Sequence, residues 1–132
     1  MKLTHASSYA LNALAHLAAA GDGVPVASHH IARARDIPER FLLKVLKPLV
    51  SAQVLLSVKG PSGGYRLARP AGTITMLEVV EAVDGPLRAE VPPVGDGKDG
   101  LDARLEEVCD QVADRVRRRL GKVRLADLAG RG

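Results

Sequence analysis

Aromatic residues and cysteine are scarce in this chain of 132 residues, which also has no tryptophan. Its aromatic side chains are Tyr9, Phe41 and Tyr65, so Leu, Val, Ile and Ala must fill any core. A hydrophobic share of 46% is enough for one modest core, and aliphatic side chains favour packed helices. We therefore expect a small, mainly α-helical protein.

The single cysteine, Cys109, excludes an intramolecular disulfide and fits a reducing compartment. No apolar run approaches the roughly 20 residues that span a bilayer. Residues 9–20 resemble the apolar part of a signal peptide, but Asn12 and His16 interrupt them. The sequence therefore predicts a cytoplasmic protein with no membrane partner.

The patterns of enzymes and metal sites are also missing. The glycine-rich residues 60–64 lack the Gly-Lys-Ser/Thr ending of a nucleotide-binding loop. No spacing of a Ser-His-Asp triad, a carboxylate pair or a zinc protease occurs. The adjacent His29 and His30 point about 100 degrees apart on a helix, and His5 and His16 lie about three turns apart. We expect no catalytic residue and no metal site.

Positive charge is concentrated in the first half of the chain. Residues 1–70 hold nine Lys and Arg against three Asp and Glu, whereas residues 71–132 have a net charge of −2. Such an asymmetry favours a polyanionic partner such as nucleic acid. The alternative is a basic face that is merely solvated, because net charge by itself selects no partner.

The first half also carries the pattern of three short helices. Thr4 is a typical cap for a first helix that stops at Gly21, and Ser28 can cap a second helix that ends near Arg35. Pro38 suits the start of a third helix. The residues predicted to be buried are Ala6, Ala10, Leu14 and Leu17 in the first helix and Leu42, Val45, Leu46 and Leu49 in the third. These three helices predict a helix-turn-helix core.

Two short strands joined by a Gly/Pro turn follow directly, within residues 56–68. A turn poor in bulky side chains can approach a phosphate backbone closely, and the cations Lys59 and Arg66 flank this one. A helix-turn-helix followed by a basic hairpin is the layout of a winged helix. The predicted fold is therefore mainly α with a small β-hairpin wing.

The second half predicts one more core helix and one long helix. Thr73 or Thr75 can start the core helix, which ends at Asp84. A long amphipathic helix follows over residues 101–120, and its apolar stripe requires a partner, either a second copy or its own domain. The predicted dimerisation residues are Leu101, Leu105, Val108, Val112, Val116 and Leu120. We divide the chain into a winged helix-turn-helix domain (1–85), a flexible loop rich in Gly, Pro and charge (86–100) and a dimerisation helix with a C-terminal segment (101–132).

The segment Ser57-Val58-Lys59-Gly60-Pro61-Ser62-Gly63-Gly64-Tyr65-Arg66-Leu67-Ala68 resembles the wing of the Rrf2 family of bacterial transcription regulators. The similarity extends from residues 1–4 and 9–11 to residues 125–128. That family includes iron-sulfur cluster and nitric oxide sensors. The resemblance implies a homodimeric regulator, usually a repressor, that binds a pseudopalindromic site in double-stranded DNA.

The resemblance also implies that the start of the third helix contacts bases and that a wing cation enters the minor groove. Arg40 is the leading candidate to contact guanine, while Lys44 can contact a base or a phosphate. Both can instead be solvated helix charges, and Phe41 and Leu43 can contact thymine methyls or pack inward. The predicted DNA-binding residues are Lys2, Glu39, Arg40, Phe41, Leu43, Lys44, Lys59, Gly60, Pro61, Ser62, Gly63, Gly64, Tyr65 and Arg66.

Two departures from the family bear on geometry and sensing. Gln53 replaces the usual glycine at a helix end, so a left-handed ending there is strained or replaced by another ending.

Relatives with an iron-sulfur cluster place three cysteines in the region of residues 87–105, where this chain has none, so we expect no cofactor. Cys109 is expected to be buried as a small hydrophobe or to act as a redox thiol between two copies. A sensor or adaptor that uses Cys109 or a protein partner is therefore the alternative function, and a protein or small-molecule effector stays unidentified.

Overall fold

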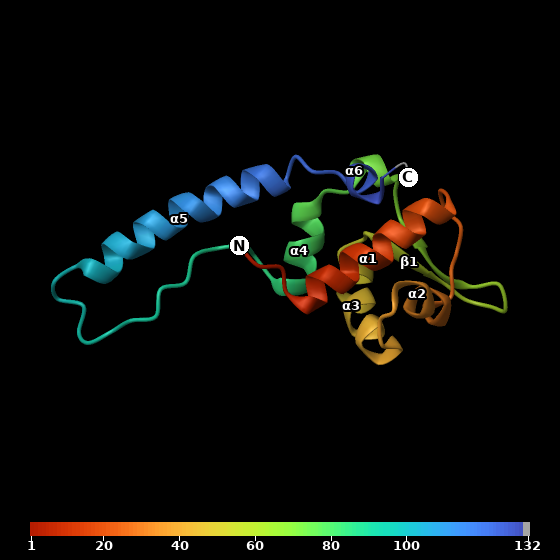
Figure 1. Ribbon diagram of the computed structural model, residues 1–132, viewed down its shortest axis with the longest axis horizontal. Coiled ribbons are helices and arrows are strands. Elements are labelled where there is room, and N and C mark those ends of the chain that lie inside the picture. Colours follow the sequence, from red (N-terminus) through yellow and green to blue (C-terminus); the bar gives the residue numbers. More distant parts are fainter. Residues whose placement is uncertain (131–132) are drawn as a thin grey trace.

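Helices dominate the structure, a computed structural model that describes residues 1–130 (Figure 1). The elements follow the order α1 (His5–Ala20), α2 (Ser28–Arg35), α3 (Glu39–Ser51), β1 (Leu55–Val58), β2 (Gly64–Leu67), the 3-10 helix η1 (Ala71–Thr73), α4 (Met76–Asp84), α5 (Leu101–Leu120) and α6 (Leu125–Ala129). The hairpin of β1 and β2 projects from one end of the domain, and α5 extends from the opposite end (Figure 1). This arrangement is a winged helix-turn-helix with a long protruding helix.

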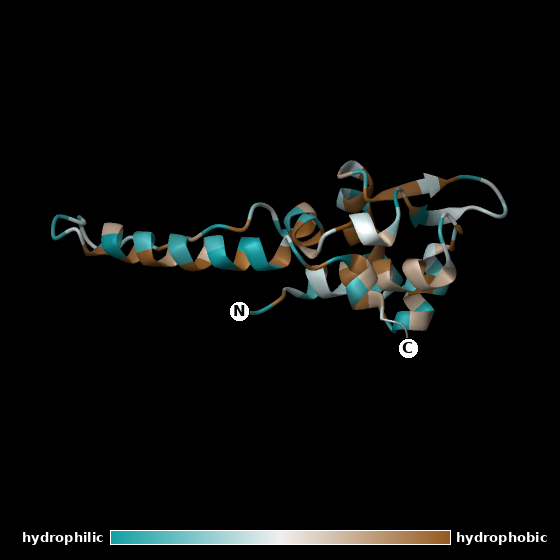
Figure 2. Ribbon diagram, turned by 90° about the horizontal axis from the view of Figure 1, so that it is seen from above, coloured by the Kyte–Doolittle hydropathy of each residue, from teal (hydrophilic) through white to brown (hydrophobic). Residues whose placement is uncertain are grey.

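Aliphatic side chains from α1 to α4 and from the hairpin form one core. The four residues predicted on α3 are all buried, with exposed fractions of 6% or less. On α1, Ala10, Leu14 and Leu17 are buried as predicted, whereas Ala6 is only half-buried. Figure 2 shows the apolar residues gathered within the domain and along one side of α5. Each fully buried leucine contributes about 1.5–3 kcal/mol to folding, so packing rather than helix propensity holds the domain together.

Side-chain caps begin two of the core helices. Thr4 caps α1 as predicted, since its Oγ1 accepts a 3.0 Å hydrogen bond from the backbone N–H of Ser7. Thr75 rather than Thr73 caps α4. Its hydroxyl accepts from the backbone N–H of Glu78 at 3.1 Å, and the Glu78 carboxylate accepts from the backbone N–H of Thr75 at 2.8 Å. This reciprocal capping satisfies two N–H groups that a helix start leaves free.

The end of α3 is strained. This is one of the two endings predicted from Gln53, the other being a different helix end. The helix continues through Pro48 to Ser51, and the chain then reverses at Gln53, whose φ is 62°. The N–H of Val54 donates back to the carbonyl of Leu49 at 3.0 Å, which closes the helix. A left-handed backbone costs a residue with a Cβ roughly 1–2 kcal/mol relative to its ordinary regions.

The C-terminal segment returns to the domain that residues 1–85 form. The backbone N–H of Met76 donates to the carbonyl of Val123, and that of Leu125 donates to the carbonyl of Ile74, both at 2.8 Å. Leu125 is 1% exposed and belongs to the core, and Leu120 is 7% exposed. Leu120, which we expected on the dimerisation stripe, therefore packs within its own chain because α5 meets the domain at its last turn.

The rest of α5 extends away from the domain, and residues 86–100 connect to its start without regular secondary structure (Figure 1). Within residues 1–130, no helix combines the length and the apolar character that crossing a membrane requires.

Candidate nucleic-acid interface

The turn between α2 and α3 sets the orientation of α3. Ala27, not Ser28, is the N-cap of α2, so the predicted cap is wrong by one position. As the first helical residue, Ser28 points its hydroxyl at α3 and donates a 2.9 Å hydrogen bond to Glu39 Oε2. Asp36 reverses the chain with φ 54°, and the side chain of Ile37, only 6% exposed, is buried in the core. These contacts hold the starts of α2 and α3 together.

The exposed side of α3 is a basic strip with an apolar residue on each border. Arg40, Lys44 and Lys47 recur at three- and four-residue spacing, so they share one side of the helix and are all exposed. Phe41 borders the strip on one side and Leu43 on the other, with exposed fractions of 38% and 42%. Neither apolar side chain therefore packs into the core, and their contact with thymine methyls stays a prediction.

Two cations flank the ring of Phe41. The Cζ atom of Arg40 lies 4.8 Å from the ring centroid, and the Nζ atom of Lys44 lies 5.7 Å from it. Both distances fall within the roughly 6 Å over which a cation is attracted to an aromatic face. The first turns of α3 thus present two positive charges beside one aromatic ring.

The wing is an antiparallel hairpin in which Leu55 pairs with Leu67 and Val58 with Gly64. Its tip holds Lys59, Gly60, Pro61 and Ser62, which are all exposed. The backbone N–H of Gly63 donates to the carbonyl of Gly60 at 3.0 Å and closes the turn. One cation at the tip of a narrow loop is suited to a phosphate backbone or a minor groove.

A backbone bridge to the segment before α2 anchors the wing. The N–H of Val26 donates to the carbonyl of Tyr65 and the N–H of Tyr65 donates to the carbonyl of Val26, both at 2.9 Å. A side chain at Gly64 would overlap the Val26 carbonyl, so this approach requires glycine. Tyr65 packs partly buried against the core. Gly64 and Tyr65, which we predicted as DNA-binding residues, therefore hold the wing in place, and our sequence reasoning did not identify Val26.

Two predicted cations lie apart from the exposed tip. Arg66 is half-buried, and its guanidinium donates to the carbonyl of Leu67 at 3.4 Å. Lys2 is exposed at the N-terminus, which Figure 1 shows on the side of the domain opposite the wing. Lys2 lines a hollow with residues 84–88, so the structure does not bring it together with the wing.

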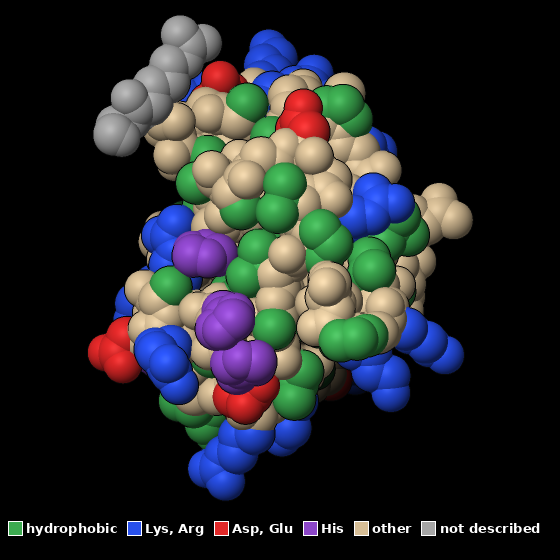
Figure 3. Space-filling model, turned by 90° about the vertical axis from the view of Figure 1, so that its right-hand side faces the viewer, with side chains coloured by type: hydrophobic (Ala, Val, Ile, Leu, Met, Phe, Trp, Pro, Cys, Tyr) green, Lys and Arg blue, Asp and Glu red, His purple; other side chains and the backbone are tan. Residues whose placement is uncertain are grey.

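Figure 3 views the molecule from the end that carries the wing, and Lys and Arg side chains lie around this face. Histidine side chains also gather on it (Figure 3). Burial, together with the positive charge of Arg35, lowers the pKa of His16 below its ordinary value. His16 is therefore neutral near pH 7 and does not add to the positive charge of the domain.

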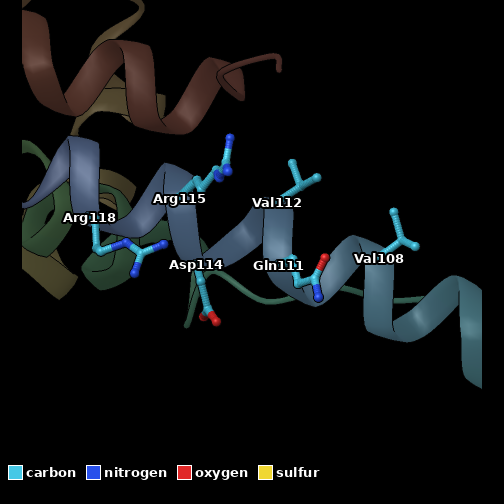
Figure 4. Close-up of a pocket in the computed structure, with 6 residues that line it drawn as sticks. All are labelled: Val108, Gln111, Val112, Asp114, Arg115 and Arg118. Carbon is cyan, nitrogen blue, oxygen red and sulfur yellow. The ribbon is translucent and has the colours of Figure 1, made fainter.

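The apolar stripe of α5 is left uncovered within residues 1–130. Leu101, Leu105, Val108 and Val112 are between 43% and 58% exposed, and Val116 is half-buried. Figure 4 shows the middle of this helix, where the labelled side chains of Val108 and Val112 point away from it on one side and Gln111 on another. All the residues that line the hollow drawn there come from α5. Such a stripe on a protruding helix requires a partner surface.

Cys109 lies next to this stripe and is exposed. The expectation of a buried cysteine is therefore wrong for the single chain, because α5 carries it away from the domain.

The described residues do not fit an iron-sulfur cluster. Clusters are held by several cysteine thiolates, and this chain has one cysteine. In residues 1–130, no group of three or more His, Cys, Asp or Glu side chains is placed to hold a metal ion.

Comparison with known proteins agrees with this architecture. The family model Rrf2, described as "Iron-dependent Transcriptional regulator", matches residues 3–131. The HTH-type transcriptional regulator named Rv1287 of Mycobacterium tuberculosis is 35% identical, over 98% of this chain and 82% of its own. The HTH-type transcriptional regulator IscR of Xenorhabdus nematophila is 31% identical, over 97% of this chain and 79% of its own.

Solved structures show the same fold. The structure of CymR, the global cysteine regulator of B. subtilis, is similar with a TM-score of 0.79 and 26% identity. That match covers 98% of this chain and 96% of CymR. These relatives are named as transcription regulators and not as enzymes. The chain therefore belongs to the Rrf2 family of DNA-binding, helix-turn-helix transcription regulators.

Proposed function

We propose that this regulator is a homodimer that represses transcription by occupying a pseudopalindromic operator. The observation that carries the proposal is the uncovered apolar stripe on α5, a helix that leaves its own domain. The wing and α5 project from opposite ends of the domain (Figure 1). Pairing two copies through α5 therefore places the two wings at the outer ends of a two-fold particle, as a palindromic site requires.

The charges of α5 support antiparallel pairing. Residues 101–110 have a net charge of −3, and residues 111–120 have a net charge of +3. Antiparallel helices place the acidic half of each copy beside the basic half of the other, whereas parallel helices place like charges together. A two-fold axis perpendicular to α5 produces this antiparallel arrangement.

The DNA contacts in this proposal come from the first turns of α3 and from the tip of the wing. Arg40 contacts a base in the major groove, and Lys44 contacts a base or a phosphate. Lys59 enters the minor groove or contacts its phosphates. Glu39 positions the helix through Ser28, and Lys2 contacts phosphate nearer the dimer axis. Repression is the commoner mode in the family, and here it follows from occupancy of the operator by the dimer.

We also infer that this regulator works without an iron-sulfur cluster, since its one cysteine cannot supply the ligands. Protein purified without oxygen is expected to be colourless and free of iron. A brown sample with stoichiometric iron and sulfide would contradict this inference.

Selection from random duplexes tests the proposal directly. The winning duplex is expected to be palindromic and bound roughly a thousandfold more tightly than a scrambled duplex. R40A should relax the preference at one position of each half-site, while K59A should weaken binding to all duplexes and reduce its salt dependence. Uniform weak binding by the unmodified protein would overturn the proposal.

A second candidate is control by thiol chemistry, which the exposure of Cys109 on α5 favours. If two copies pair through α5, oxidation of Cys109 changes the interface directly. An oxidant should then alter the affinity for DNA in the unmodified protein and not in C109S. The same response in both proteins would exclude this mode.

A further inference from the structure

The proposed function uses Glu39, Arg40 and Lys44 of α3 and leaves the ring of Phe41 without a role. Phe41 is the only phenylalanine of the chain and is 38% exposed, while its neighbour Leu42 is fully buried. It follows Glu39 by two residues, so it lies in the first turn of α3. In a helix-turn-helix, the first turns of the recognition helix lie against base edges. The ring is therefore placed where sequence is recognised.

The ring also restricts the guanidinium of Arg40. The Arg40 Cζ atom lies 4.8 Å from the ring centroid, with the Lys44 Nζ atom 5.7 Å away from the same centroid. The ring face attracts both cations. A planar guanidinium held against a ring has fewer orientations to lose when it forms hydrogen bonds. The contact with Phe41 thus limits the orientations of the Arg40 guanidinium before DNA binds.

The major groove offers a matching pair of chemical groups. Guanine presents the O6 and N7 acceptors that a guanidinium can contact with two hydrogen bonds. Thymine presents its C5-methyl group, which an apolar side chain can contact in the major groove. Arg40 and Phe41 are adjacent in sequence and in contact, so together they can reach groups on neighbouring base pairs.

We infer that Phe41 determines specificity in two ways: it contacts the C5-methyl of a thymine, and it positions Arg40 on the guanine next to that thymine. This inference rests on the proposed function, because it requires α3 to lie in the major groove. It predicts a guanine and a thymine on neighbouring base pairs in each half of the operator.

Base analogues in the selected operator separate the two roles. Replacing the thymine by deoxyuridine removes only the methyl group, and this should weaken binding about fourfold per half-site. Replacing the guanine by 7-deazaguanine removes only the N7 acceptor, and this should weaken binding roughly tenfold. Titration of labelled duplexes by fluorescence anisotropy measures both losses in the unmodified protein.

Variants of Phe41 test whether this residue causes the two losses of DNA affinity. F41L keeps an apolar side chain without an aromatic face, so it should retain the deoxyuridine loss and reduce the 7-deazaguanine loss. F41A should reduce both losses. L128A is the matched control, since Leu128 on α6 is similarly exposed at 45% and lies outside the predicted DNA-binding residues, and it should leave both losses unchanged. Thermal unfolding should be similar for all three variants because none of them changes a buried residue.

The outcomes distinguish this inference from the proposed function. Tight, sequence-specific binding that is unaffected by deoxyuridine would overturn the inference and leave the proposed function intact. Persistence of the methyl dependence in F41A, or its loss in L128A, would also overturn it. Failure of the unmodified protein to prefer any duplex over a scrambled one would overturn the proposed function itself.

Discussion

The Ser7 hydroxyl donates a 2.7 Å hydrogen bond to Oδ2 of Asp84 and so joins the start of α1 to the end of α4. Ser7 is completely buried, and the hydroxyl of Thr4 donates to the same carboxylate at 2.9 Å. The acceptor lies 77 residues from Ser7 in the sequence. A carboxylate beside the start of a helix is also favoured by the helix dipole.

Replacing Asp84 by Ala should destabilise the protein by about 1–3 kcal/mol, because the buried hydroxyl of Ser7 loses its acceptor. D84N keeps an oxygen acceptor and should cost less. Urea denaturation followed by circular dichroism measures both variants. Equal stability of D84A and the unmodified protein would show that Ser7 finds another acceptor.

Replacing Gly64 by Ala should separate the wing from Val26, since a Cβ at this position overlaps the Val26 carbonyl. DNA affinity is expected to fall because the wing tip is no longer held in place. Gly60 is a matched control, since a Cβ there meets no atom within 4 Å, although its φ of 103° disfavours Ala as well. Hydrogen exchange at the N–H groups of Val26 and Tyr65 should accelerate in G64A and stay slow in G60A.

Replacing Gln53 by Gly should stabilise the protein by about 0.5–1 kcal/mol, because glycine adopts a positive φ without strain. Ala52 supplies the control, since its φ is −81° and glycine brings no such relief. A52G should therefore be neutral or destabilising. Chemical denaturation of both variants measures the difference, and a less stable Q53G would contradict the strain argument.

The pH dependence of stability should include a contribution from His16. Burial, with the charge of Arg35, lowers the pKa of this residue in the folded state, while the unfolded chain has a pKa of about 6.5. The unfolded state therefore binds the proton more readily, and stability falls as the pH drops below about 6.5 towards the folded pKa. H16Q should lose this part of the dependence, whereas H5Q, at an exposed position, should keep it. Urea midpoints at pH 7.5 and pH 5.5 test the difference.

Replacing Val112 by Glu should dissociate the proposed dimer and leave the domain folded, because this side chain is 57% exposed in the single chain. Q111E introduces the same charge on an exposed neighbour outside the stripe and should remain dimeric. Light scattering after gel filtration gives the mass of each variant. A dimeric V112E would place the interface elsewhere.

The spacing of apolar residues along the sequence predicted the helices with one apolar face, whether that face is buried, as on α3, or exposed, as on α5. The four apolar residues of α3 recur with the helical period, and all four are buried. The stripe of α5 has the same regularity, so both the helix and its apolar side were predictable. The Gly/Pro turn and its two short strands similarly indicated the wing. These features depend on residues close together in the chain.

Contacts between distant residues were decided by the tertiary structure alone. Val26 pairs with Tyr65, and Leu125 returns to the core beside Ile74, without any local pattern that marks either contact. Leu120 and Cys109 lie on the same helix, yet one is buried and the other exposed, because only the last turn of α5 meets the domain. Periodicity shows which residues share a face, and only the packed chain determines what covers that face.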